Sequence, residues 1–99
     1  MYKDDITGAD PEVLREVGGR LRALRKARGL TLADTAEATG LHPTTVSRAE
    51  HGDNPTLLTV IRLLRAYGRL AAIESFIPES EVSPMALVRQ HRREGARGG

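Results

Sequence analysis

Small polar side chains and one arginine gather between positions 44 and 48 of this 99-residue chain. Hydroxyl and guanidinium groups hydrogen-bond well to the edges of nucleobases, and a short helix that carries them fits the major groove of DNA. A helix that served only a core would not leave four of five successive positions polar. We therefore expect Val46 to face inward and the polar residues to face outward. These polar residues are Thr44, Thr45, Ser47 and Arg48.

Other chemistries need residues that the chain lacks or scatters. The sequence contains no Cys, which excludes disulfides and thiolate metal sites. His42, His51 and His91 are too scattered, and lack spaced acidic ligands, so neither a metal nor another cofactor is expected. Ser47 and His51 stand at helical spacing, but no acid orients the histidine as hydrolytic catalysis would require. Because no phosphate-binding glycine loop is present either, an enzyme is not expected.

Charge is unevenly distributed along the chain, although the formal net charge is only +2. Basic residues concentrate at positions 15–28 and 89–97, and acidic residues gather near the N-terminus and around Pro78. Basic faces attract phosphate, although a solvated helix surface is the alternative. No apolar run approaches the roughly 20 residues that cross a membrane, and the N-terminus does not resemble a secretory signal. We therefore expect a cytoplasmic protein without a membrane partner.

A long helix is predicted to precede the polar segment. It begins at Asp10, a capping acid, with Pro11 at the first helical position. The pair Gly18–Gly19 weakens its middle and could permit another helix to approach closely. Gly29 ends it as a C-terminal cap. Apolar residues at spacings of three and four predict one buried stripe, formed by Leu14, Val17, Leu21 and Leu24.

Two short helices joined by a tight turn are predicted next. Thr31 and Asp34 have the spacing of a capping box, which predicts a helix start. Gly40 breaks this helix, because the turn needs a left-handed backbone conformation that glycine adopts cheaply. Pro43 begins the helix that carries the polar residues, and that helix ends before Gly52.

A fourth helix is predicted after Thr56, which caps it. Its inner stripe is expected to consist of Leu57, Val60, Ile61 and Leu64. The following segment, 69–77, fits a helix better than a strand, although Phe76 and Ile77 beside Pro78 leave a strand open. Ser83 and Pro84 could begin a last short helix that carries Met85, Leu87 and Val88.

The segment from Thr31 to Gly52 resembles the phage repressor and Cro family of helix-turn-helix proteins, also called the XRE family. The family pattern is a small residue, a turn glycine, an apolar residue and a Ser/Thr-rich helix that ends in Glu-x-Gly. This pattern is met at Ala36, Gly40, Leu41, Val46, Glu50 and Gly52. The resemblance covers roughly residues 13–67. Thr35 and Ala49 are smaller than the residues usual at their positions in the family, which predicts modest stability.

The resemblance implies an all-α fold: a compact bundle of four to five helices of the lambda repressor type, with a C-terminal segment for dimerisation. Residues 10–68 would form the helix-turn-helix DNA-binding domain and residues 69–78 the dimerisation segment. Residues 1–9 carry no periodicity and are expected to be disordered, and residues 79–99 are expected to form a basic tail.

The resemblance also implies roles for individual residues. Base contacts are implied for the start and outer face of the third helix, at Pro43, Thr44, Thr45, Ser47 and Arg48. Phosphate contacts are implied for the caps and the following loop, at Thr31, His42, Asn54 and Thr56. For Arg48 we favour direct readout of guanine, and the alternatives are a phosphate contact or a surface ion pair. Thr44 and Thr45 could instead be ordinary helix-start residues.

An ion pair between Arg25 and Glu50 is also implied, because the family often pairs a first-helix Arg with the Glu that ends the third helix. Such a pair would be structural and would link the two helices. The alternative is that both side chains are exposed and contribute little to stability.

Two functions follow from the resemblance. The first is a sequence-specific transcriptional regulator, expected to be a repressor, that binds double-stranded DNA at a pseudo-palindromic operator as a homodimer. The alternative is an antitoxin of a type II toxin–antitoxin operon that also represses its own promoter and has a toxin protein as partner. An apolar patch resembles the dimer segment of HipB-type antitoxins in position, and consists of Leu70, Ile73, Phe76 and Ile77.

Overall fold

Every regular element is helical in the part of the chain that the computed structural model describes, which is residues 8–80, 85, 88 and 89. The prediction of an all-α fold is therefore confirmed. The elements are α1 (Asp10–Ala27), α2 (Leu32–Thr39), α3 (Pro43–Glu50), α4 (Leu57–Ala66), the 3₁₀ turn η1 (Leu70–Ala72) and α5 (Ile73–Phe76).

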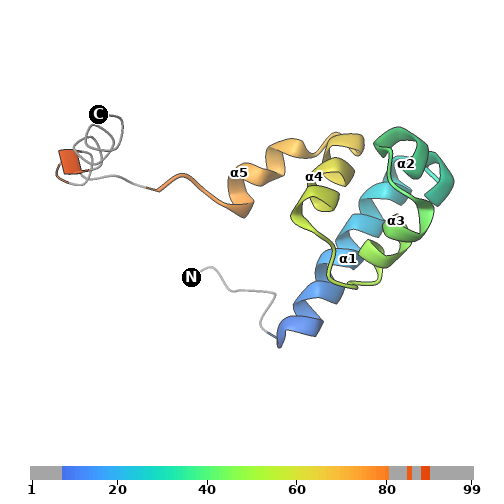
Figure 1. Ribbon diagram of the computed structural model, residues 1–99, viewed down its shortest axis with the longest axis horizontal. Helices are drawn as coiled ribbons and strands as arrows, with labels where there is room; N and C mark the ends of the chain where they lie inside the picture. The colour runs from blue at the N-terminus through green and yellow to red at the C-terminus, as the bar shows by residue number, and fades with distance from the viewer. Residues whose placement is uncertain (1–7, 81–84, 86–87, 90–99) are drawn as a thin grey trace.

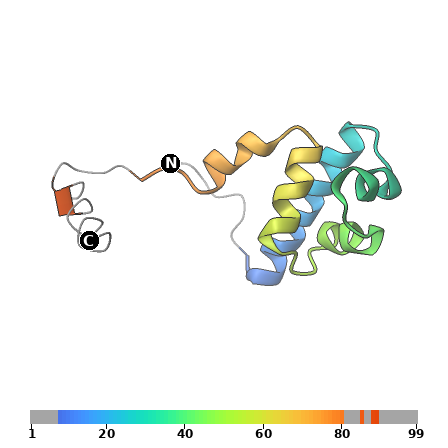
Figure 2. The same ribbon diagram turned by 45° about the horizontal axis from the view of Figure 1, so that its top comes forward.

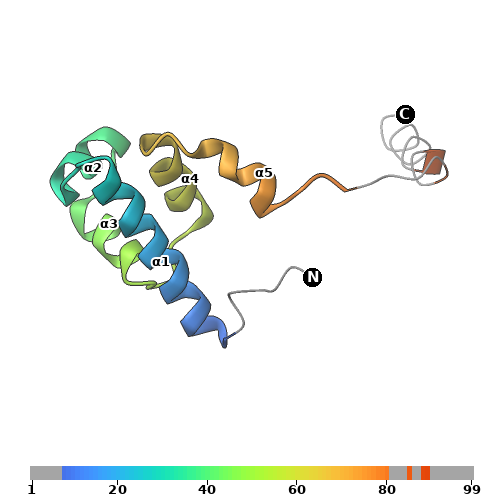
Figure 3. The same cartoon turned by 180° about the vertical axis from the view of Figure 1, so that it is seen from behind.

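Helices α1 to α4 form the bundle, and α5 extends away from it (Figure 1). The longest helix, α1, packs against α3, while α2 packs against both α3 and α4. Turned by 45°, the molecule shows α2 and α3 at one end and α5 leading away from the other (Figure 2). From behind, α1 runs along the length of the bundle (Figure 3).

The core lies where α1, α2, α3 and α4 meet. Val46 and Leu63 are fully buried, and Tyr67, the residue that ends α4, is the largest fully buried side chain. The remaining buried apolar residues are Leu21, Ala36 and Ala49. The predicted inward orientation of Val46 is confirmed.

Local hydrogen bonds start and stop the helices largely as predicted. The capping box of α2 is present: the Asp34 N–H donates to Thr31 Oγ1 at 3.0 Å, and the Thr31 N–H donates to Asp34 Oδ2 at 2.9 Å. Thr56 caps α4 by accepting from the Thr59 N–H at 3.1 Å. The prediction for α1 was wrong by one residue, because Ala9 occupies the capping position and Asp10 lies inside the first turn without making a side-chain cap.

Gly18 lets α1 and the end of α3 approach closely. A Cβ atom added at Gly18 would lie 2.5 Å from the Glu50 carbonyl oxygen and 2.6 Å from that of Ala49. A Cβ atom at Gly19 would meet nothing within 4 Å. The expected close approach of another helix therefore depends on Gly18 and not on Gly19.

The expected inner face of α4 was only partly correct, because Leu64 packs against the core but the buried positions of the helix are others. Thr59 and Leu63 face the core and continue to Tyr67 at four-residue intervals. Leu57 is 51% exposed. Val60, Ile61 and Leu64 are half-buried. Apolar residues occur on almost every side of α4, so spacing alone could not select its buried face.

The segment after α4 is helical, as favoured, and consists of η1 and α5. Met85, Val88 and Arg89 are also helical. The predicted start of a last helix at Ser83 and Pro84 lies outside the described residues. The same holds for nearly all of the expected disordered segment 1–9 and for most of the basic tail 79–99.

Candidate DNA-binding interface

Helix α3 buries one side and leaves its predicted base-contacting side accessible. Val46 is 0% exposed and Ala49 is 1% exposed. On the opposite side, Thr44 and Arg48 are exposed, and Pro43 is exposed at the first position of the helix. Thr45 and Ser47 are half-buried at the edges of this side. We call the five residues Pro43, Thr44, Thr45, Ser47 and Arg48 the α3 outer face.

The first turn of α3 is capped by a histidine. His42 Nδ1 accepts a hydrogen bond from the Thr44 N–H at 3.1 Å. An accepting Nδ1 places the ring proton of the neutral imidazole on Nε2. The exposed His42 ring thus combines a structural role with an N–H that is available to a phosphate oxygen.

The start of α2 carries a second residue that was predicted to contact DNA phosphate. Thr31 is exposed, and its hydroxyl oxygen accepts the capping hydrogen bond. Hydrogen bonds from Thr31 hold the pKa of Asp34 below its usual value, the backbone bond contributing most. Helix N-termini attract anions, although the Asp34 carboxylate already occupies part of this one.

The loop from α3 to α4 carries the remaining predicted phosphate contacts. Asn54 is exposed and has a positive φ of 42°. The hydroxyls of Thr56 and Thr59 share a hydrogen bond of 3.0 Å. The Thr56 hydroxyl is thus engaged with α4, and a phosphate contact at this position would use the backbone N–H.

Arg25 and Glu50 form a forked, buried ion pair between α1 and the end of α3. Arg25 Nε donates to Glu50 Oε2 at 2.6 Å, and Nη2 donates to Oε1 at 3.0 Å. Arg25 Nη1 also donates to the Leu30 carbonyl at 2.8 Å. The hydrogen bond to Glu50 raises the pKa of Arg25, and burial opposes this increase. The pair fixes α3 on the long helix and ties both to the segment before α2.

Two buried hydroxyls beside this pair were not found from the sequence. Thr35 Oγ1 and Tyr67 OH are buried and have no partner in hydrogen-bond geometry within the described part of the chain. Burial raises the pKa of Tyr67, and the nearby Thr35 hydroxyl lowers it to a smaller extent. The one signal in the sequence was Thr35 itself, which stands at a position where the family usually has a larger apolar residue. Nothing in the sequence indicated that Tyr67 would lie beside it.

Asp53 is a second residue that sequence reasoning missed. Its Oδ2 lies 3.9 Å from Arg48 Nε, and both side chains are largely exposed. Sequence reasoning had assigned no role to Asp53. The ion pair appears because the chain turns back along α3 after Gly52.

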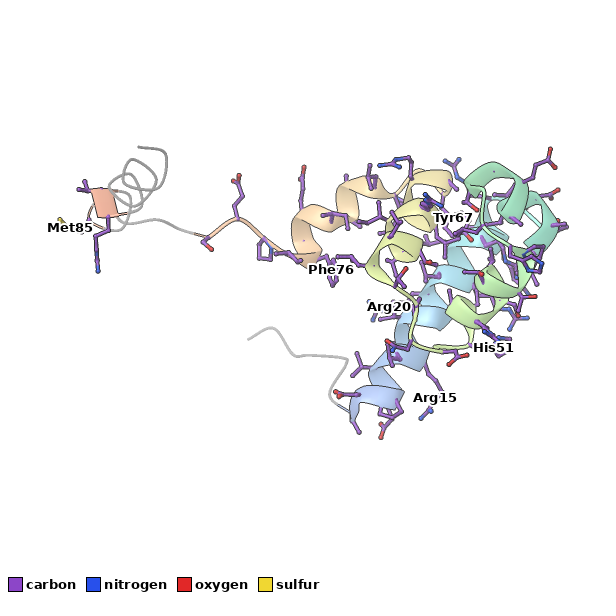
Figure 4. The ribbon with its side chains drawn as sticks, viewed as in Figure 1. Arg15, Arg20, His51, Tyr67, Phe76 and Met85 are labelled. Atoms are coloured by element: carbon purple, nitrogen blue, oxygen red, sulfur yellow. The ribbon has the colours of Figure 1, made fainter. Side chains whose placement is uncertain are left out.

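The predicted dimerisation residues lie on η1, on α5 and at the residue that follows α5. Phe76 and Ile77 are 58% and 65% exposed. Leu70 is also exposed, and Ile73 is half-buried. Figure 4 shows Phe76 on the far part of α5, well away from Tyr67 in the bundle. An apolar surface is therefore accessible beyond the four-helix bundle.

The described residues contain no helix long and apolar enough to cross a membrane. Within the same residues, no group of three or more His, Asp or Glu side chains could hold a metal ion. A family described as helix-turn-helix (HTH_3) matches residues 21–72. No curated protein sequence matched the chain.

Proposed function

Since the match covers more than half of its length, the chain belongs to the XRE-type helix-turn-helix family of DNA-binding transcription regulators, and we propose that it represses transcription as a homodimer on a pseudo-palindromic operator. Such a repressor would work in the cytoplasm at the nucleoid, where it would exclude RNA polymerase from the promoter.

The orientation of α3 carries this proposal. Val46 and Ala49 anchor the helix in the core, which leaves Thr44 and Arg48 exposed one helical turn apart on the same side. A side of this kind can enter the major groove with its hydroxyl and guanidinium groups toward base edges. We assign base contacts to the α3 outer face, with Arg48 directed at guanine.

Phosphate contacts would orient the protein on the duplex. We assign them to Thr31, to the free Nε2–H of His42, to Asn54 and to the backbone N–H of Thr56. These positions belong to the α2 and α4 caps, the α3 cap and the loop that follows α3. They are thus on the segments that flank the α3 outer face.

The apolar residues on η1 and α5 support a homodimer. Phe76 and Ile77 are exposed, and Leu57 on α4 adds a further exposed apolar side chain. Burial of apolar surface drives most protein association, and a twofold dimer would place two recognition helices in successive major grooves about 34 Å apart.

Selection of bound duplexes from a random pool at two salt concentrations tests this function. We expect an inverted repeat whose half-sites are about one helical turn apart, with an affinity that falls steeply as salt increases. Enrichment of a single half-site would contradict dimeric binding. A pool that gains no preferred sequence would contradict sequence-specific regulation.

An antitoxin role is the second candidate. It is favoured by the exposed Phe76 and Ile77, which lie after the residues that the family match covers. Co-expression with the product of the adjacent open reading frame tests it. Growth arrest by that product alone, together with rescue and a stable complex on co-expression, would support the role, and a product without toxicity would contradict it.

A further inference from the structure

The end of α3 has the hydrogen-bond pattern of a Schellman motif, and this pattern brings two oppositely charged side chains together. The Asp53 N–H donates to the Arg48 carbonyl at 2.9 Å, and the Gly52 N–H donates to the Ala49 carbonyl at 3.1 Å. In this motif the first of these two hydrogen bonds spans more residues, and the side chains of the two residues that it joins commonly meet in an apolar contact. Here they are Arg48 and Asp53, and they meet as an ion pair.

The protein backbone fixes the position of Asp53. Gly52 has a φ of 74°, the left-handed conformation that turns the chain back along α3. A Cβ atom at Gly52 would lie 2.7 Å from backbone atoms of Leu14 and Arg15, so the turn is packed directly against α1. Asp53 therefore leaves a constrained turn and not a free loop.

We propose that Asp53 is a positioning residue that makes Arg48 select guanine over backbone phosphate. This inference rests on the proposed DNA-binding function. The carboxylate lies on the Nε side of the Arg48 guanidinium, and the two terminal nitrogens have no partner among the described residues. Those two nitrogens can donate together to guanine O6 and N7.

The same carboxylate disfavours the competing contact. A phosphate that approached Arg48 would also approach Asp53 Oδ2, 3.9 Å from Arg48 Nε, and like charges repel. A guanine edge offers neutral acceptors and meets much less repulsion. Asp53 would therefore weaken binding to duplexes without the correct guanine more than binding to the operator.

The test compares dissociation constants for two duplexes, one selected from the random pool and one with its contacted guanine replaced. We expect Asp53→Asn to reduce the ratio of these constants by up to about fivefold, the upper limit for an interaction between two exposed charges, mainly by tighter binding to the altered duplex. Arg48→Ala should remove the preference for that guanine, and Asp53→Asn should have little further effect on the ratio in the Arg48→Ala background.

A matched control is available on α1. Glu16 pairs with the exposed Arg20 at 2.9 Å, so Glu16→Gln also removes one negative charge and one surface pair. Glu16 is two residues from Gly18, which faces α3, and thus lies on nearly the opposite side of α1. We expect this variant to keep the wild-type ratio, and both variants to keep the wild-type melting temperature.

Three results would overturn the inference. The first is that the ratio of the two dissociation constants in Asp53→Asn stays within twofold of the wild-type ratio, although Arg48→Ala loses the guanine preference. The second is an equal effect of Asp53→Asn with and without Arg48, which would indicate a general charge effect. The third is a wild-type protein without a preferred sequence, which would also contradict the proposed function.

Discussion

Charged and hydroxyl side chains inside the bundle determine how firmly α3 is held. Arg25 and Glu50 are both buried and make two hydrogen bonds to each other. The third Arg25 nitrogen is occupied by the Leu30 carbonyl. Loss of either partner would leave a buried charge without compensation, which is more costly than loss of the whole pair.

Arg25→Ala and Glu50→Ala are each expected to lower the free energy of unfolding by about 3–5 kcal/mol. The double variant should lose clearly less than the sum of the two single losses, because the second substitution removes the unpaired charge. Denaturant unfolding of the four proteins in the cycle measures this coupling. Additive losses would show that the pair contributes no interaction energy.

Thr35→Val should leave the protein equally stable or stabilise it by up to about 1 kcal/mol, because it keeps the side-chain shape and removes a buried hydroxyl that has no hydrogen-bond partner among the described residues. Thr35→Ala is the matched comparison, and we expect it to be less stable than Thr35→Val because it leaves a cavity. Denaturant midpoints measure both effects. A marked loss of stability in Thr35→Val would mean that the hydroxyl is satisfied.

The raised pKa of Tyr67 predicts a decrease in stability at alkaline pH. Burial favours the neutral phenol, so the folded state holds its proton above the usual pKa of 10.0 that applies when the chain is unfolded. The unfolded state then binds fewer protons than the folded one, and stability falls as the pH rises above about 10. Tyr67→Phe should show a flatter pH dependence in this range, measured by denaturant unfolding between pH 8 and pH 11.

At the scale of elements, backbone contact between α1 and the end of α3 sets the position of the recognition helix. Gly18 and Gly52 both face backbone atoms at distances that exclude a Cβ atom. The side-chain pair Arg25–Glu50 joins the same two helices. Helix α3 is therefore fixed at its C-terminal end, and its N-terminal turn remains free for a ligand.

Gly18→Ala is expected to lower stability by about 1–3 kcal/mol, because the new methyl group would overlap the Ala49 and Glu50 carbonyls. Gly19→Ala provides the neighbouring control, since it points into open space and should gain about 0.5–1 kcal/mol of helix stability. Thermal unfolding of the two variants measures the difference. Equal effects would contradict the close packing at Gly18.

At the scale of the whole molecule, the apolar residues beyond the bundle bear on assembly. Phe76 and Ile77 contribute exposed apolar surface on and after α5, outside the buried core. In Figure 4, Phe76 lies far from the α3 end that His51 marks. We propose that a second copy seated on this surface leaves the α3 outer face accessible to DNA.

Phe76→Glu is expected to raise the dissociation constant of the proposed homodimer at least about tenfold, because a charge would have to be buried in an apolar interface. Sedimentation equilibrium measures this constant, and binding to an inverted repeat should weaken toward that of a single half-site. Ala23→Glu adds the same charge to the exposed side of α1 and should leave the dimer unchanged. A Phe76→Glu variant with the wild-type constant would exclude α5 from the interface.

Much of the fold was predictable because its determinants are local. The Thr31–Asp34 capping box, the Thr56 cap and the left-handed turn at Gly40 each depend on residues within a few positions. The polar residues around Val46 also indicated which side of α3 is exposed. In contrast, the inner face of α4 was predicted correctly only at Leu64, because the apolar residues of this helix fit more than one buried stripe.

The sequence by itself determined the all-helical class, the turn between α2 and α3 and the outward position of Thr44 and Arg48, because caps, turns and polar spacing act over one or two helical turns. Only the tertiary structure decided which glycine of the pair touches α3 and which face of α4 is buried. These features depend on the packing of α1 against α3 and of α4 against α2. Such contacts join residues far apart in the chain, so the spacing of neighbouring residues does not encode them.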